Sequence, residues 1–332
     1  MARRRIGQEA LALAGSGQAG RGSTLDQLAT LIDWAPVEVH LKDVYAAAKG
    51  EPAWPPLALF RALLIAVWYD LSDVKLAEAL DDRASFRRFC GFAAHEPVPE
   101  RTSFVRFRKA LLARGLDTVL FDEVTGQLRA KAVRVKTGTL VDATVIPSAT
   151  KGDGEAAWAG HRSRKAVHGY KAHVGADADT ALVETVAVTP GNVNDGRAGP
   201  SALPEVVGGG SQRLRPAKRV GVASGGEVFA DSAYRGPHFA AAVRARGGVP
   251  RIVATHVWCH KDADGPALLR TINGPIQRVR GRIEKIFGTC KRSYGLHRMR
   301  WCGLAKAGLQ VRLTAIAYNL RRTMTILQER CA

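Results

Sequence analysis

Residues 140–146 read Leu-Val-Asp-Ala-Thr-Val-Ile, and residues 228–231 read Val-Phe-Ala-Asp. Both stretches predict β-strands because apolar, β-branched and aromatic residues dominate them. Each carries one aspartate: Asp142 lies inside the first stretch and Asp231 ends the second. A buried aspartate is costly without a partner, and open sheets place their sites at the carboxyl ends of strands. The two stretches therefore indicate a β-sheet and a candidate functional site formed by aspartates on its strands.

Each aspartate also has a purely structural interpretation. Asp142 could be a strand-edge residue that pairs with a neighbouring arginine. Asp231 could be the N-cap of the segment that follows it, which is a common role for aspartate.

Around these two strands the pattern alternates between strands and helices. Further β-rich stretches lie at 170–176, 182–188 and 249–254, and helical stretches lie near 196–207, 236–246 and 272–290. This order predicts a mixed α/β (α+β) domain over residues 131–326, with a mixed five-stranded sheet and helices packed on it. Residues 208–226 are predicted to form a polar loop inside this domain.

The preceding part of the chain has a helical pattern. Apolar residues at three- and four-residue steps share one helix face, and Pro55 and Pro56 suit the start of that helix. Ser72 and Thr102 are predicted to cap two further helices, and Gly115 to end the last of them. We therefore expect residues 25–130 to form an all-helical domain and residues 1–24, which are rich in arginine, to form a flexible basic arm.

A third carboxylate stands out by its surroundings. Glu284 lies in a predicted helix, and between Arg278 and Arg300 it is one acidic residue among eight Lys or Arg. The structural alternative is an ion pair with Arg280 or Lys291 on the same helix face. Such a pair on a surface contributes only about 0–1 kcal/mol, so stability alone explains Glu284 poorly.

The three carboxylates make chemical sense as a set. Two divalent ions, Mg²⁺ or Mn²⁺, held by Asp142, Asp231 and Glu284 could activate the attacking oxygen and stabilise the leaving oxygen at a phosphodiester.

Composition favours a polyanionic partner. The chain has 49 Lys and Arg against 30 Asp and Glu, a formal net charge of +19. Basic side chains bind DNA with release of condensed counterions, although a membrane surface or the ribosome would also attract such a charge. The five cysteines lack the tight pairs of a disulfide framework or a zinc site, and no signal peptide or membrane span is predicted. We expect a cytoplasmic protein.

From about residue 53 to residue 325 the chain resembles bacterial DDE transposases of the insertion-sequence-five type. The carboxylate strands and the stretches 54–57, 102–108, 168–174 and 189–195 are similar to segments of that family. Its sharpest signature is an Arg, a Glu four residues later and a Lys seven further on, which Arg280, Glu284 and Lys291 match. The family also has a tyrosine three residues before that arginine, where this chain has Gln277.

The resemblance implies a ribonuclease-H-like fold with the Asp142 and Asp231 strands side by side. It also implies divalent metal and binding to double-stranded DNA, both at the terminal inverted repeats of a mobile element and at a target. We expect Arg280 and Lys291 to clamp phosphates beside the metals. The remaining candidate DNA contacts are His168 and Lys171, in a basic segment, and Arg106 and Arg108, on a predicted DNA-reading helix. For each of these, a solvated basic face is the structural alternative.

The sequence thus predicts a DNA transposase that cleaves element ends and joins the freed 3′-hydroxyl to target DNA, acting as a homodimer or a larger assembly. Two alternatives stay open: a related metal-dependent nuclease without joining activity, and a non-catalytic DNA-binding repressor derived from a transposase.

Overall fold

The computed structural model of the chain describes residues 4, 6–7, 23–45, 52–132, 138–161, 164–205, 226–256 and 264–331. The chain divides into two compact units. The first comprises Met1–Lys131, Ser293–Gly295 and Arg312–Ala332, and the second comprises Ala132–Arg292 and Leu296–Val311. The predicted polar loop and most of the predicted basic arm lie outside the described residues.

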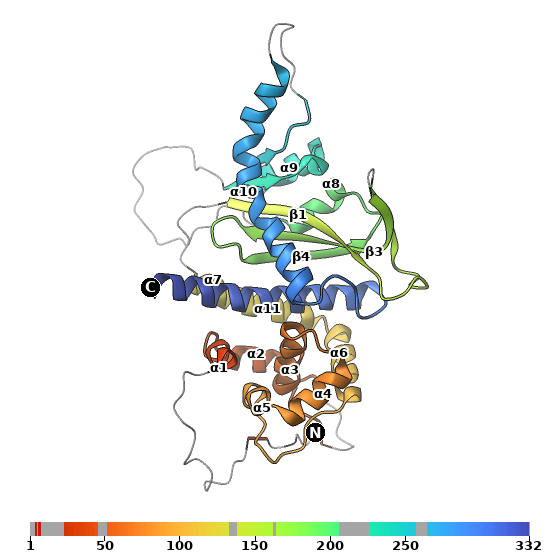
Figure 1. Cartoon of the computed structure of the whole chain (residues 1–332), viewed down its shortest axis with the longest axis vertical. Helices are drawn as coiled ribbons and strands as arrows, with labels where there is room; N and C mark the ends of the chain where they lie inside the picture. The colour runs from red at the N-terminus through yellow and green to blue at the C-terminus, as the bar shows by residue number, and fades with distance from the viewer. Residues whose placement is uncertain are drawn as a thin grey trace. The chain divides into compact units, whose positions relative to one another are not determined.

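The first unit is helical (Figure 1). Its helix α3, Pro56–Trp68, is buried along almost its whole length, in keeping with a helix that is apolar on every side. Ser72 caps the next helix as predicted, by accepting a hydrogen bond from the backbone N–H of Lys75 (3.3 Å). The other helices before residue 132 are α1 Thr24–Ala29, α2 Trp34–Leu41, α4 Asp73–Asp82, α5 Ala84–Cys90, α6 Arg101–Ala113 and α7 Leu116–Lys131.

Part of the last helix, α11 (Leu304–Cys331), belongs to this helical unit. The indole N–H of Trp68 donates to the carbonyl of Ala317 (2.9 Å), and Arg312 forms an ion pair with Asp117 of α7 (2.6 Å). Residues at opposite ends of the sequence therefore share one core.

The second unit is built on a six-stranded mixed sheet. The main order is β2-β3-β1-β5-β6, and β4 also pairs with β3. Strand β1 is antiparallel to β3 and parallel to β5, so the two carboxylate strands are neighbours as predicted. The strands are β1 Gly138–Pro147, β2 Ala157–His161, β3 Arg164–Asp177, β4 Val183–Pro190, β5 Glu227–Ala230 and β6 Val249–Ile252.

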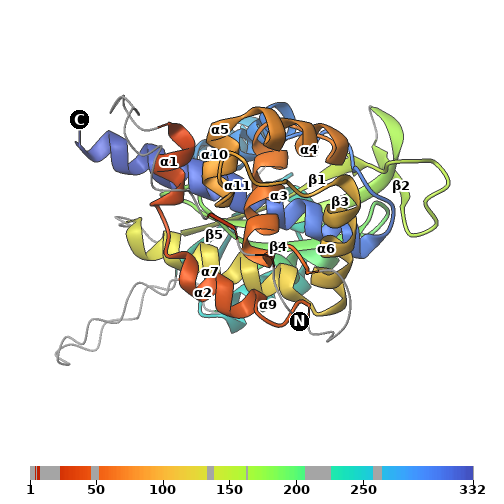
Figure 2. The same cartoon turned by 90° about the horizontal axis from the view of Figure 1, so that it is seen from below.

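Helices cover both faces of this sheet. Helix α10 (Gly265–Ser293) crosses one face and α9 (Pro237–Ala245) packs on the other, as Figures 1 and 2 show from two directions. On the α9 face, Val141 packs with Phe239 and Val243 of α9. Because successive strand residues point to opposite faces, Asp142 faces α10. Short helices α8 (Asp195–Ala198), η2 (Gly199–Ala202) and η3 (Ser232–Tyr234) complete the unit within the described residues.

Four details differ from the sequence predictions. The helical stretch expected near 196–207 is observed as the two short helices α8 and η2, which end at Ala202. The sheet has a sixth strand, β2, where we predicted five. Helix α10 starts at Gly265, earlier than the predicted 272. The N-cap of α6 is Glu100 and not Thr102, which lies inside the helix. None of the helices in the described ranges combines the length and the apolar composition that crossing a membrane requires.

Candidate active site

Asp142 lies in the middle of β1 with both carboxylate oxygens engaged. Oδ1 accepts the backbone N–H of Ala143 (2.8 Å), and Oδ2 accepts from a terminal nitrogen of Arg280 on α10 (3.1 Å). The Asp142 side chain is 16% exposed and that of Arg280 is 13% exposed. The structural alternative from the sequence, an arginine partner for this aspartate, is therefore present in the structure.

Asp231 follows directly after β5, at its carboxyl end. Its Oδ1 accepts the backbone N–H of Ala233 (2.8 Å), so it caps the short helix η3. In the parallel pairing of β1 with β5, Leu140 lies opposite Phe229. Continuing this register by two residues brings Asp142 level with Asp231. The sheet thus sets the two aspartates side by side.

The charge of Asp231 acts on the carboxyl group of Asp142. Burial raises the pKa of Asp142 to about 6, while Arg280 and the Ala143 N–H oppose the rise and the charge of Asp231 adds to it. When two carboxylates lie close together and are partly shielded from water, a nearby positive charge stabilises their ionised forms. Arg280 supplies one such positive charge, through its ion pair with Asp142.

Glu284 does not join the pair. It lies on α10, where its side chain is exposed. Within the described residues, no three His, Cys, Asp or Glu side chains are close enough together to hold a metal ion. On the helix, Glu284 is about 40° from Arg280 and about 20° from Lys291, so it is on the side of α10 from which these two reach β1.

Arg280 and Lys291 both contact β1. Arg280 pairs with Asp142, and the Lys291 ammonium donates to the carbonyl of Val145 (3.1 Å). The ion pair of Arg280 is with Asp142 and not with Glu284, the partner that the sequence left open as an alternative. The basic face of α10 is therefore turned toward the strand that carries the first aspartate.

Lys171 lies on the other face of the sheet. It is opposite Val145 in the β1–β3 register, and its ammonium binds the carbonyl of Val193 and the carboxylate of Asp195, both at 2.9 Å. In this structure Lys171 fixes the turn before α8.

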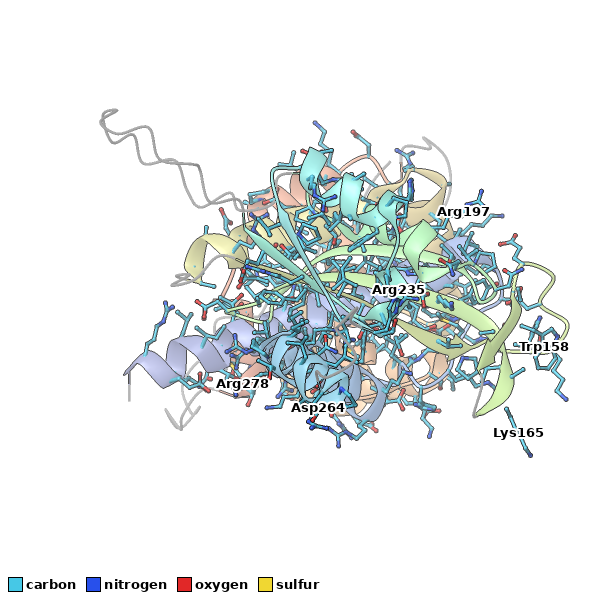
Figure 3. The ribbon with its side chains drawn as sticks, turned by 90° about the horizontal axis from the view of Figure 1, so that it is seen from above. Trp158, Lys165, Arg197, Arg235, Asp264 and Arg278 are labelled. Atoms are coloured by element: carbon cyan, nitrogen blue, oxygen red, sulfur yellow. The ribbon has the colours of Figure 1, made fainter. Side chains whose placement is uncertain are left out.

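His168 instead packs against Trp158 of the neighbouring strand, with ring centroids 5.3 Å apart and the ring planes tilted by 53°. Figure 3 shows Trp158 and Lys165 at the outer end of the β2–β3 hairpin.

The two candidates on α6 have different environments. Arg108 is buried and forms an ion pair through two nitrogens with Asp73 of α4, at 2.7 and 2.5 Å. Arg106 is exposed. Of the two, only Arg106 presents its side chain to solvent.

Sequence reasoning missed Tyr234 and Asp195. Tyr234 is 1% exposed, and its hydroxyl is buried without a hydrogen-bond partner in the described part of the chain. Burial, with the charges of Asp142, Asp195 and Asp231, raises its pKa far above the usual value for tyrosine, so the hydroxyl stays protonated. The available signal was that Tyr234 and Asp195 both lie in stretches that resemble the family, 230–234 and 189–195.

The oxygens of the aspartate pair suit a hard divalent cation such as Mg²⁺ or Mn²⁺. The charge of Asp231, which adds to the raised pKa of Asp142, fits a site that a cation completes. Glu284 could supply a further oxygen only from a position other than the one it has here.

Two family models match the chain. The model described as a transposase DDE domain matches residues 134–320, more than half of the 332-residue chain. The model described as a transposase domain (DUF772) matches residues 16–110. No solved structure matches the chain. The DDE match includes the aspartate pair and all of α10.

Proposed function

Because the chain belongs to the DDE transposases, enzymes that act on DNA, we propose that Asp142, Asp231 and Glu284 are its catalytic and metal-binding residues. One observation carries the proposal: β1, which contains Asp142, is parallel to β5, which Asp231 follows, in a register that would bring the two aspartates level if it were continued by two residues. The charge of Asp231 acts on Asp142, as expected for ligands of a shared cation.

Divalent ions, two Mg²⁺ or Mn²⁺, would supply Lewis-acid activation of the phosphodiester and of the attacking oxygen when bound. Asp142 and Asp231 would hold them from the sheet. Glu284 would approach from α10 by a rotation of its side chain or a small movement of the helix. Arg280 and Lys291, on the same side of α10, would bind the DNA phosphates beside the metals.

The reaction would have two in-line steps. A water attacks the phosphorus at the end of the mobile element, the bond to the 3′ oxygen breaks, and that oxygen leaves as a hydroxyl. The freed 3′-hydroxyl then attacks a phosphorus of the target DNA, and the target's own 3′ oxygen leaves. Each step replaces one phosphorus–oxygen bond by another.

Several finer points belong to this proposal. The DNA partners would be the terminal inverted repeats and the target, bound by a homodimer or a larger assembly of the chain in the cytoplasm, at the nucleoid. The helical domain (25–130) would contribute DNA contacts through the exposed Arg106, with the arm of residues 1–24. The insertion-sequence-five type remains our interpretation of the sequence motifs.

The test is cleavage and strand transfer by Asp142→Asn, Asp231→Asn and Glu284→Gln. Each should abolish cleavage and leave DNA binding intact. Glu227→Gln is a matched control, since Glu227 begins the same strand that Asp231 follows and pairs with Arg251 at a partly exposed site (2.7 Å). If one of the three variants cleaves DNA as fast as the wild type, the residue substituted in it is not catalytic.

A second candidate is the non-catalytic DNA-binding repressor. The exposed position of Glu284 favours it, because the described residues do not gather three carboxylates. DNA binding without any cleavage in Mg²⁺ or Mn²⁺ would support the repressor. A substrate with a precut 3′ end tests the nuclease alternative, since a nuclease forms no joined product.

A further inference from the structure

Arg280 holds Asp142 through a single hydrogen bond. The chain contains a fuller pairing of the same two residue types in its helical unit, where Arg108 contacts both oxygens of Asp73. At Asp142 only Oδ2 receives an arginine nitrogen, because Oδ1 already accepts from the Ala143 backbone. The ion pair of Arg280 with Asp142 therefore has one hydrogen bond, where that of Arg108 with Asp73 has two.

The rest of the Arg280 guanidinium is also incompletely satisfied. Its Nε is buried and has no hydrogen-bond partner among the described residues. A buried donor without an acceptor is unfavourable, and a guanidinium has five N–H donors to satisfy. Arg280 therefore has an unmet capacity for an anionic group with more than one oxygen.

A phosphate would meet that capacity. Arginine binds phosphate through two parallel N–H···O bonds, which its single contact with Asp142 does not provide. Lys291, on the same side of α10, reaches β1 at Val145 and adds a second positive charge along this side. A DNA backbone lying along α10 could draw Arg280 away from Asp142.

A divalent cation and Arg280 compete for the same oxygen. The guanidinium occupies Oδ2 of Asp142 at 3.1 Å, and like charges in a poorly solvated place repel strongly. An ion that binds Asp142 must displace Arg280 or bind with reduced affinity.

We infer that Arg280 takes the place of the divalent ion at Asp142 in the DNA-free protein and moves to a DNA phosphate when DNA binds. Arg280 is then a positioning residue that makes metal binding conditional on DNA. The inference rests on the proposed role of Asp142 as a metal ligand. It adds a thermodynamic coupling, which by linkage must act equally in both directions.

The experiment measures Mn²⁺ binding to the full chain without DNA, by the electron paramagnetic resonance signal of the free ion. Arg280→Gln should bind Mn²⁺ about tenfold more tightly than the wild type, within the usual range of such couplings. Arg280→Lys retains the positive charge and should bind as weakly as the wild type. Arg278→Gln is the matched control: it removes an exposed positive charge from the same helix, about 200° around the helix axis from Arg280, and its Mn²⁺ affinity should stay within about twofold of the wild type.

The second arm adds a duplex of about 30 base pairs at low salt, where basic proteins bind DNA without sequence preference. DNA should raise the Mn²⁺ affinity of the wild type, and Arg280→Gln should lose most of this increase. Circular dichroism would establish that each variant is folded.

The outcomes separate this inference from the proposed function. Asp142→Asn should lose Mn²⁺ binding in both the wild-type and the Arg280→Gln background. If it binds Mn²⁺ like the wild type, the metal site is elsewhere and both proposals fail. If Asp142→Asn loses binding but Arg280→Gln binds no more tightly than the wild type, only the role of Arg280 is overturned.

Discussion

His173 is a fully buried imidazole in β3, held by a hydrogen bond between its Nε2 and the hydroxyl of Thr189 (2.9 Å). Burial lowers its pKa from 6.5 to about 4; the charge of Lys171 also lowers it, and that of Asp195 opposes the fall. The imidazole is therefore neutral in the folded protein near neutral pH, whereas an unfolded chain would bind a proton below pH 6.5.

This difference predicts a pH-dependent stability. The stabilisation is fully present above pH 6.5 and is lost as the pH falls through about 4. Its full size is about 3 kcal/mol from the change in pKa. Urea unfolding of the wild type and of His173→Gln at pH 7 and pH 4.5 would test it. The variant should start less stable but lose less stability on acidification, and equal losses would contradict the explanation.

At the scale of single residues, the sequence predicted where a candidate residue lies on a strand or helix better than it predicted which residue it contacts. Asp142 and Asp231 could be selected because each stood in or after an apolar strand. The pairing of Lys171 with Asp195, and of Arg108 with Asp73, could not be predicted, because such contacts depend on how separate elements pack. Lys171 had been selected as a DNA contact for its charge and its place in a stretch that resembles the family, and Arg108 for its place on a predicted DNA-reading helix.

At the scale of elements, α10 carries glycines that its helical conformation does not require. A Cβ added to Gly281 would meet nothing within 4 Å. Gly199, in contrast, lies against the ring of Tyr234, where a Cβ would come within 2.7 Å of two ring carbons and 2.8 Å of Phe239. The same substitution should thus have opposite effects at the two positions.

We expect Gly281→Ala to raise the free energy of unfolding by about 0.5–1 kcal/mol, because alanine loses less backbone entropy in a helix. Gly199→Ala should lower it by about 1–3 kcal/mol through overpacking. Gly199→Ala should also reduce cleavage, since it displaces the segment that follows Asp231. Thermal and urea unfolding of both variants would measure the effects, and destabilisation by Gly281→Ala would refute the account of α10.

The elements that the sequence predicted well have a strong periodic pattern. Strand β5 was predicted to within one residue of its observed bounds, because four residues between polar stretches leave little choice. Strand β2 was missed, since Ala-Trp-Ala-Gly-His has two alanines and a glycine and weak strand propensity. It pairs with β3 as the other half of a hairpin, which tertiary context and not composition specifies.

At the scale of the whole molecule, the helical unit depends on α11. The contacts that join the C-terminal part of α11 to the rest of this unit include those of Trp68 with Ala317, Asp117 with Arg312, and Thr125 with Asn319 (3.3 Å). Nothing in the local pattern of residues 25–130 indicated this dependence, because the partners are nearly two hundred residues away in the sequence.

A fragment of residues 23–132 should therefore be much less stable than the same fragment joined to residues 312–331 through a flexible linker. The shorter fragment exposes the apolar surface that α11 covers and leaves Asp117, which is 8% exposed, without its cationic partner. Thermal unfolding followed by circular dichroism would compare the two, with Arg312→Glu in the joined fragment as a control that should remove part of the gain. Equal melting temperatures for the two fragments would show that α11 is dispensable for this unit.

The sharing of α11 has a consequence for biosynthesis. The ribosome makes α1 to α7 early, but the helix that closes their core only after the whole second unit has been made. During translation the helical segment would therefore expose the apolar surface that α11 later covers, and chaperones or proteases could bind it there. The first unit to be synthesised is thus the last to be completed, and a transposase truncated before residue 312 would lack a finished helical unit.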